Sequence, residues 1–169
     1  MGLPVLPLRP LVTRELFGPD GVVIAVTTAA TIGNNSQASS ALVDNSQTLF
    51  LDAFVTVRVT VGTIVAPSYV NIYAAGTSDG ATFGGNETGM GQDAAVTLTS
   101  PPNIRLAGMI NAPTSTTAYQ TVFSVAAAFG GLLPLQWCLV IENKTGAALT
   151  AATAFYQGVW SQQYMQPTF

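Results

Sequence analysis

The stretch LFLDAFVTVRVTVG, residues 49–62, decides the fold of this chain, because every second residue in it is apolar. A period of two that is rich in β-branched residues predicts a strand with one face in a core. The residues expected to face that core are Leu49, Leu51, Ala53, Val55, Val57, Val59 and Val61. The opposite face is more mixed and carries Phe50, Asp52, Phe54, Thr56, Arg58 and Thr60. The pattern resumes in residues 69–75 after a Gly/Pro loop, and we predict that the two runs pair antiparallel.

Short strands separated by turns account for most of the remaining chain. They are predicted at 22–28, 41–43, 95–99, 104–111, 135–143 and 153–163, with a strand or a short helical turn at 121–128. In 135–143 the core face is expected to carry Leu135, Trp137, Leu139 and Ile141. About eight strands and no long helix predict an all-β, antiparallel β-sandwich of jelly-roll or related Greek-key type. An immunoglobulin-like sandwich is the alternative, because a missing Cys–Trp–Cys spacing excludes only its disulfide-bonded members.

Residues 1–16 are predicted to form an extended, proline-punctuated N-terminal arm, followed by a single β-sandwich domain over residues 17–169. Pro4, Pro7 and Pro10 stand at every third position, which favours a polyproline-like chain. The arm is apolar, whereas a free disordered tail is usually charged. It is therefore expected to pack either along its own domain or on a neighbouring subunit. A shortage of charge elsewhere in the chain favours the neighbour.

That shortage is the main feature of the composition. Of the 169 residues 49% are hydrophobic and only 8% are charged, against a usual charged share of about 25%. The chain contains no apolar run of roughly 20 residues, so no membrane span is expected. We expect apolar surface to be covered by other subunits, in a homo-oligomer. A net charge of −3 with five scattered basic residues argues against a nucleic-acid partner. No signal-peptide pattern opens the chain, which favours synthesis in a cytoplasm without secretion.

No catalytic constellation is visible. The chain has no histidine and one cysteine, Cys138, which is expected to be a buried inert thiol. A histidine-dependent nucleophile and a structural zinc site are thus excluded within the chain. We predict that the protein is not an enzyme and needs no cofactor or metal, with a surface calcium site at Asp79, Glu87 and Asp93 as a minor alternative. Asp52 and Arg58 share one strand face but lie too far apart to pair, so each is expected to meet a cross-strand or intersubunit partner.

Aromatic side chains provide an alternative from another functional class. A carbohydrate-binding module would stack sugars on residues such as Tyr69, Tyr73, Phe83, Trp137, Trp160 and Tyr164. These residues are spread over several predicted strands and both faces, which is more typical of a core.

Five strings from residue 31 onward carry a resemblance: LFLDAFVTVRV, YVNIYAAGTSDGATF, NIRLAGMINAP, FSVAAAFGGLLPLQW and NKTGAAL. In these strings the chain resembles small structural proteins of tailed bacteriophages. The resemblance implies a β-sandwich virion component, namely a capsid cement or decoration protein that binds the major capsid protein and copies of itself. A phage neck or tail component is the nearest variant.

A cement protein needs an interface with apolar and aromatic anchors and a polar rim. We place these anchors on the arm and on the C-terminal tail: Leu3, Val5, Leu6, Leu8, Trp160, Tyr164 and Phe169.

Overall fold

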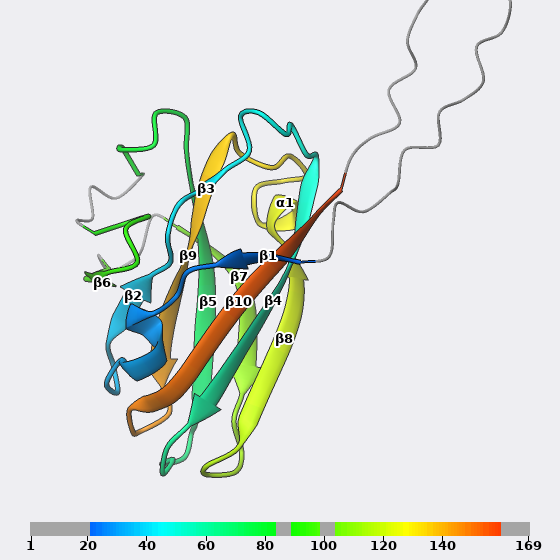
Figure 1. The fold of residues 1–169 in the computed structure, drawn as a ribbon. Helices are drawn as coiled ribbons and strands as arrows, with labels where there is room; N and C mark the ends of the chain where they lie inside the picture. Colours follow the sequence, from blue (N-terminus) through cyan, green and yellow to red (C-terminus); the bar gives the residue numbers. More distant parts are fainter. Residues whose placement is uncertain (1–20, 84–88, 99–103, 160–169) are drawn as a thin grey trace, which may run out of the picture.

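The computed structural model describes residues 21–83, 89–98 and 104–159, which form two antiparallel β-sheets packed face to face (Figure 1). Sheet A has the order β1 (Val22–Ile24), β10 (Leu149–Val159), β4 (Asp52–Val61) and β8 (Ala118–Ser124). Sheet B has the order β6 (Ala95–Val96), β2 (Gln37–Ser39), β9 (Gln136–Lys144), β5 (Tyr69–Thr77) and β7 (Arg105–Asn111). The short strand β3 (Val43–Asp44) also pairs with β9. The predicted all-β, antiparallel sandwich is confirmed.

Helical structure is limited to two single turns in the described part of the chain. They are the 3₁₀ turn η1 (Thr28–Thr31) and α1 (Val125–Ala128). Ser124 caps α1, because its hydroxyl accepts a hydrogen bond from the Ala127 amide at 3.0 Å. Among the described residues, no helix has the length and apolar character needed to cross a bilayer.

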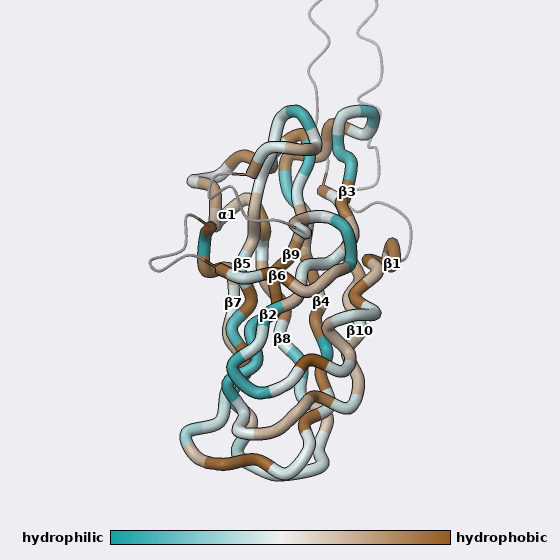
Figure 2. Tube along the Cα trace, turned by 90° about the vertical axis from the view of Figure 1, so that its left-hand side faces the viewer, coloured by the Kyte–Doolittle hydropathy of each residue, from teal (hydrophilic) through white to brown (hydrophobic). Residues whose placement is uncertain are grey.

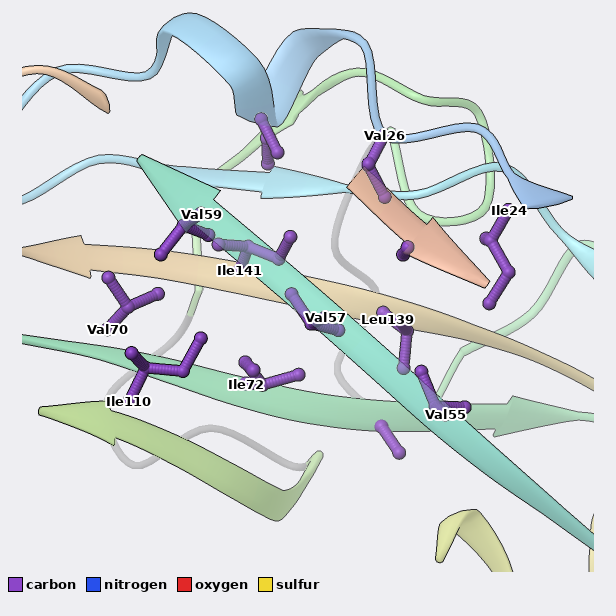
Figure 3. Packing of buried hydrophobic residues seen from close by; sticks show 14 of the residues in the cluster. Ile24, Val26, Val55, Val57, Val59, Val70, Ile72, Ile110, Leu139 and Ile141 are labelled. Carbon is purple, nitrogen blue, oxygen red and sulfur yellow. The ribbon is translucent and has the colours of Figure 1, made fainter. Parts of the chain in front are cut away.

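The core lies between the sheets and is built from the inward positions of their central strands. Val55, Val57 and Val59 of β4 are fully buried. In Figure 3 β4 crosses in front of β9 and β5, and these valines lie among Val70 and Ile72 of β5 and Leu139 and Ile141 of β9. Burial of each such side chain contributes about 1.5–3 kcal/mol of transfer free energy, so this layer is the main stabilising element. Figure 2 shows the layers from the edge, with apolar residues recurring along the strands.

The predicted pairing of the two long runs is wrong. In the structure β4 pairs with β10 and β8, whereas β5 pairs with β9 and β7. The two runs instead face each other across the core. Each buries one alternating apolar face, and packing those faces together removes both from water, which pairing in one sheet alone does not do.

The first residues of the organising stretch also depart from the prediction. Leu49 and Leu51 are exposed, and Phe50 is buried in their place. Leu49 has a positive φ of 50°, which breaks the alternation before β4 begins. The side chain of Asn45 fixes this turn, since it accepts from the Phe50 amide at 2.8 Å and donates to the Phe50 carbonyl at 2.9 Å. The core face therefore begins at Ala53.

Several predicted boundaries also shift. The strand expected at 22–28 ends at Ile24 and gives way to η1, and the one at 41–43 is replaced by the short strands β2 and β3. Residues 121–128 contain both predicted forms in succession, the end of β8 and then α1. Trp137, Leu139 and Ile141 lie in the core as predicted, but Leu135 precedes β9 and is exposed. Cys138 is buried as expected, and burial raises the pKa of its thiol to about 11.

Candidate interaction surface

The residues predicted to anchor the chain to partners lie outside the described residues. They are Leu3, Val5, Leu6, Leu8, Trp160, Tyr164 and Phe169. The structure does describe the strands that follow the arm and precede the tail. Strands β1 and β10 are antiparallel neighbours in sheet A, with Val22 opposite Tyr156. The first and last strands of the described chain, β1 and β10, therefore lie side by side.

The outer face of sheet A carries a row of side chains that crosses all four strands in register. Val23 of β1 lies opposite Phe155 of β10, Phe155 lies opposite Thr56 of β4, and Thr56 lies opposite Val122 of β8. Neighbouring strands are about 4.8 Å apart, so these four residues form one continuous line. We call this line the outer row.

Three of the four side chains in the outer row are apolar and exposed. The exposed fraction is 80% for Val23, 59% for Val122 and 39% for Phe155. Phe54, two residues before Thr56 on the same face of β4, is 40% exposed. Val23, Phe54, Val122 and Phe155 together form what we call the apolar patch. Single exposed apolar residues are ordinary, but a contiguous group on one sheet face indicates an interaction site.

Strand alternation explains why these residues point outward. Their sequence neighbours Ile24, Val55, Phe123 and Ala154 are buried in the core. A side chain one position away in a strand must point to the other face. The patch is thus a fixed consequence of the register that builds the core, and it requires no rearrangement to be presented.

Two charged residues on β4 lie on either side of the patch. Asp52 accepts hydrogen bonds from the Ser124 hydroxyl at 2.7 Å and the Ala126 amide at 2.9 Å. Ser124 of β8 is thus a cross-strand partner, which is one of the two kinds of partner expected for Asp52. Arg58 lies between Thr153 and Gln120 on the adjacent strands, is exposed, and has no hydrogen bond or ion pair with the rest of the described residues. Arg58 is therefore available to a partner.

A shallow groove with a mixed polar and apolar lining lies at the edge of sheet A. It runs between β1 and residues 41–44 and is lined by Val22, Val23, Ile24, Ala25, Ala41, Leu42, Val43, Asp44 and Tyr156. The groove lies next to Gly21, where the described chain begins.

The outer face of sheet B has a different character, because a buried carboxylate organises part of it. Glu142 Oε1 accepts from Gln37 Nε2 at 3.1 Å and lies 3.3 Å from Lys144 Nζ. Its Oε2 accepts from Asn71 Nδ2 at 2.9 Å and the Tyr73 hydroxyl at 3.0 Å. Burial alone would raise the pKa of Glu142, but these partners outweigh it and hold the pKa below its ordinary value of 4.5.

The part of that face over β5 and β9 is covered by the chain itself. A second apolar cluster on the outer side of β5 and β9 contains Ala75, Phe83, Met90, Val96, Ile104, Cys138 and Val140. Phe83, Met90 and Val96 belong to the segment that follows β5, which returns over the sheet. Strand β9 is consequently buried on both faces, and the large apolar side chains that sheet B does expose, Leu106 and Met109, lie on its edge strand β7.

The carboxylates proposed for a calcium site have local roles where they are described. Asp79 Oδ1 accepts from the Ala81 amide at 2.9 Å, the Thr82 amide at 2.7 Å and the Thr77 hydroxyl at 2.8 Å, which lowers its pKa. Asp93 accepts from the Thr28 amide at 3.1 Å, and Glu87 lies outside the described residues. Within the described ranges there is no group of three or more His, Cys, Asp or Glu side chains that could hold a metal ion.

The aromatic residues of the carbohydrate-binding alternative divide into two groups. Trp137 and Phe83 are buried, and Trp137 packs edge-on against Tyr156 with ring centroids 5.5 Å apart. Neither ring can stack on a sugar in this conformation. Tyr69 and Tyr73 are partly exposed on the outer face of sheet B, while Trp160 and Tyr164 lie outside the described residues.

The sequence analysis did not select any residue of the apolar patch as a binding residue. One signal was present, because Phe54 stands among the outward positions of a strand whose inward positions are all small or β-branched. The row as a whole could not be found, since it depends on the pairing of four strands that are far apart in the sequence.

Comparison with models of known families, with curated proteins and with solved structures finds no match to this chain.

Proposed function

We propose that this protein is a non-catalytic structural component of a phage virion, namely a capsid cement or decoration protein that binds the major capsid protein and copies of itself. The observation that carries the proposal is the apolar patch on sheet A of a chain with only 8% charged residues. A free monomer is better served by a charged, patch-free surface. A protein whose role is to be covered by neighbours needs an exposed apolar face of this kind.

The strand order supports the proposal. Strands β1, β4, β8 and β10 lie in sheet A and β2, β5, β7 and β9 lie in sheet B, so among these eight strands the chain changes sheet at every step except from β5 to β7. We propose that these eight strands form a jelly roll, in which two Greek keys wind around one another. Jelly rolls occur in viral capsid proteins and in lectins, and this topology is therefore compatible with a virion component.

The arm and the tail extend the proposed interface. Because β1 and β10 are adjacent in sheet A, residues preceding Gly21 and residues following Val159 join the sandwich near the apolar patch. Anchors at Leu3, Val5, Leu6 and Leu8 and at Trp160, Tyr164 and Phe169 would then add to one continuous binding side. Specific interfaces bury about 1,600 Å² in total, and a single sheet face of this size falls short of that area.

The test is occupancy on purified virions of the phage that carries this chain. We expect the wild-type chain to be present in hundreds of copies, and a variant lacking residues 1–10 to bind more weakly while remaining folded. Val122→Asp should also reduce occupancy, whereas Leu106→Asp should not. Leu106 is a matched control, since it is 58% exposed on β7 of the other sheet. Unchanged occupancy for both the deletion and Val122→Asp would refute the proposal, and about a dozen copies would identify a neck or tail component.

The carbohydrate-binding alternative requires a different test. Trp137 is fully buried, so Trp137→Ala would disrupt the core and its loss of binding would not be informative. Binding on a glycan array that is lost in Tyr69→Ala or Tyr73→Ala, with the fold retained, would favour the carbohydrate module instead.

A further inference from the structure

We propose that a second copy of this chain docks on the outer face of sheet A, with a two-fold axis that runs along the outer row. This inference deepens the proposed function and rests on it for its purpose, because it names the surface through which copies of the protein associate. The association itself is a property of the isolated protein and can be measured without a capsid.

The outer row is suited to contact with itself. A two-fold axis in the plane of the interface and along the row places each row residue opposite its own copy. Val23, Phe155 and Val122 would then meet Val23, Phe155 and Val122 of the second molecule, with Thr56 at the centre. Apolar side chains from both sheets would meet in the about 10 Å that separates stacked sheets.

The charges on β4 favour an axis along the outer row over a two-fold axis along β4. Rotation about the row exchanges positions two residues before and after Thr56, so Arg58 of one copy lies over Phe54 of the other. A guanidinium over an aromatic ring is a favourable contact, and the symmetry forms it twice. A two-fold axis along β4 would instead bring Arg58 toward Arg58 of the second copy, which is repulsive. The outer row is thus the axis that the charge pattern permits.

The same charge pattern argues for a copy of this chain as the occupant. On this face Asp52 is already engaged by Ser124 and Ala126, and Arg58 is the one charged side chain without a partner in the described residues. A strongly acidic or basic partner would find little to pair with. A second copy supplies an equally apolar surface, and its Phe54 provides a site for Arg58.

The size of the face sets the expected strength. Four strands about 4.8 Å apart and about seven residues of β4 at about 3.3 Å each define a face of roughly 20 Å by 25 Å. Two such faces bury on the order of 1,000 Å² in total, at the lower end for specific interfaces. We therefore expect a reversible dimer with a dissociation constant in the micromolar range.

The first measurement is analytical ultracentrifugation of the full chain from about 1 µM to about 300 µM, which brackets a micromolar dissociation constant. The wild type should dimerise across this range. Val122→Asp, which places two carboxylates together on the axis, should weaken the dimer at least about tenfold. Leu106→Asp, at the matched position on sheet B, should leave it unchanged. A monomer at all concentrations, or equal effects of the two substitutions, would overturn the proposal.

The second measurement tests the axis and does not depend on the stability of a charged variant. Val122→Cys should be joined to Val122→Cys of a second copy by a short bis-maleimide, and Leu106→Cys should not. Cys138 stays out of the reaction, because it is buried and its thiol pKa is raised to about 11. A dimer without this cross-link would refute the axis along the row.

Two further outcomes separate this inference from the proposed function. If the wild type is a monomer and dimerises only after residues 1–16 are removed, the chain's own arm covers the patch and the second copy is excluded. If dimerisation is absent but virion occupancy depends on Val122, the patch binds the capsid protein, so the inference fails and the proposed function stands. If the chain dimerises through the outer row but never binds virions, the inference stands and the proposed function fails.

Discussion

The two outer faces of the sandwich arise from the same alternation of residues, yet the chain covers their apolar side chains to different extents. On sheet B the chain covers β5 and β9, with an apolar cluster at one end and the hydrogen-bonded carboxylate of Glu142 at the other, and leaves Leu106 and Met109 of the edge strand β7 exposed. On sheet A the described residues leave Val23, Phe54, Val122 and Phe155 in contact with solvent. The difference indicates that the outer side of β5 and β9 serves the stability of the monomer, whereas the apolar patch on sheet A is available for binding.

The cost of burying a charge explains why both carboxylate oxygens of Glu142 on sheet B have hydrogen-bond partners. A carboxylate removed from water is unfavourable unless its oxygens are fully paired. Glu142 obtains its partners from three strands and both of its oxygens are used, by Gln37 of β2, Asn71 and Tyr73 of β5, and Lys144 of β9 itself. On the outer face of sheet A the carboxylate of Asp52 is held by Ser124 and Ala126 at one end of β4, whereas the apolar patch itself contains no charged group.

The largest effect is therefore expected from Glu142→Ala. This change leaves the polar groups of Gln37, Asn71 and Tyr73 without their acceptor in a partly buried site. Each lost partner costs about 1 kcal/mol or more, so we expect a loss of about 2–4 kcal/mol in the free energy of unfolding. Urea denaturation followed by tryptophan fluorescence provides the measurement.

Glu142→Gln is the matched control, because it keeps the shape and one acceptor oxygen. It should destabilise the protein less than Glu142→Ala does. If both variants lose less than about 0.5 kcal/mol, which is the range typical of ordinary surface positions, the contrast between the two faces is wrong.

A smaller effect of the same network is expected in the pH dependence of stability. The pKa of Glu142 is lowered in the folded state, so its contribution is present above the unfolded value of 4.5 and is lost as the pH falls through the folded value. The wild type should therefore lose stability between pH 6 and pH 3. Glu142→Gln has no proton to take up at this position, so its stability should fall less over the same interval.

Part of the pH dependence should remain in Glu142→Gln. Hydrogen bonds from the Thr82 and Ala81 amides lower the pKa of Asp79, and hydrogen bonds from Ser46 lower that of Asp44. Both contribute in the same direction. Parallel pH profiles for the wild type and Glu142→Gln would mean that the network does not favour the ionised carboxylate.

The sequence predicted the part of this fold that local alternation controls. Val55, Val57 and Val59 of β4 and Leu139 and Ile141 of β9 were assigned to the core correctly, because a period of two forces side chains to one face. Leu49 and Leu51 were assigned wrongly, since the turn held by Asn45 reverses the alternation before β4. Local pattern fails where a side-chain hydrogen bond changes the backbone conformation.

Long-range pairing was less accessible. The prediction that β4 and β5 pair assumed that adjacent runs form a hairpin, whereas their connection crosses from one sheet to the other. The outer row requires the register of four strands that span residues 23–155, which no local pattern contains. The Glu142 network has the same origin, because Gln37 and Glu142 are 105 residues apart.

The smallest effect is expected from Val122→Thr, which tests whether the outer face of sheet A is exposed in the monomer. Val122→Thr replaces a methyl group with a hydroxyl at a position that is 59% exposed, so at low protein concentration the free energy of unfolding should change by less than about 0.5 kcal/mol. Val57→Thr makes the same change at a fully buried position of the adjacent strand and should cost about 1–3 kcal/mol. Low concentration matters, because dimerisation would add apparent stability by mass action. If Val122→Thr costs as much as Val57→Thr under these conditions, the chain covers its own apolar patch. The outer face of sheet A would then be covered by the chain itself, as the outer side of β5 and β9 is.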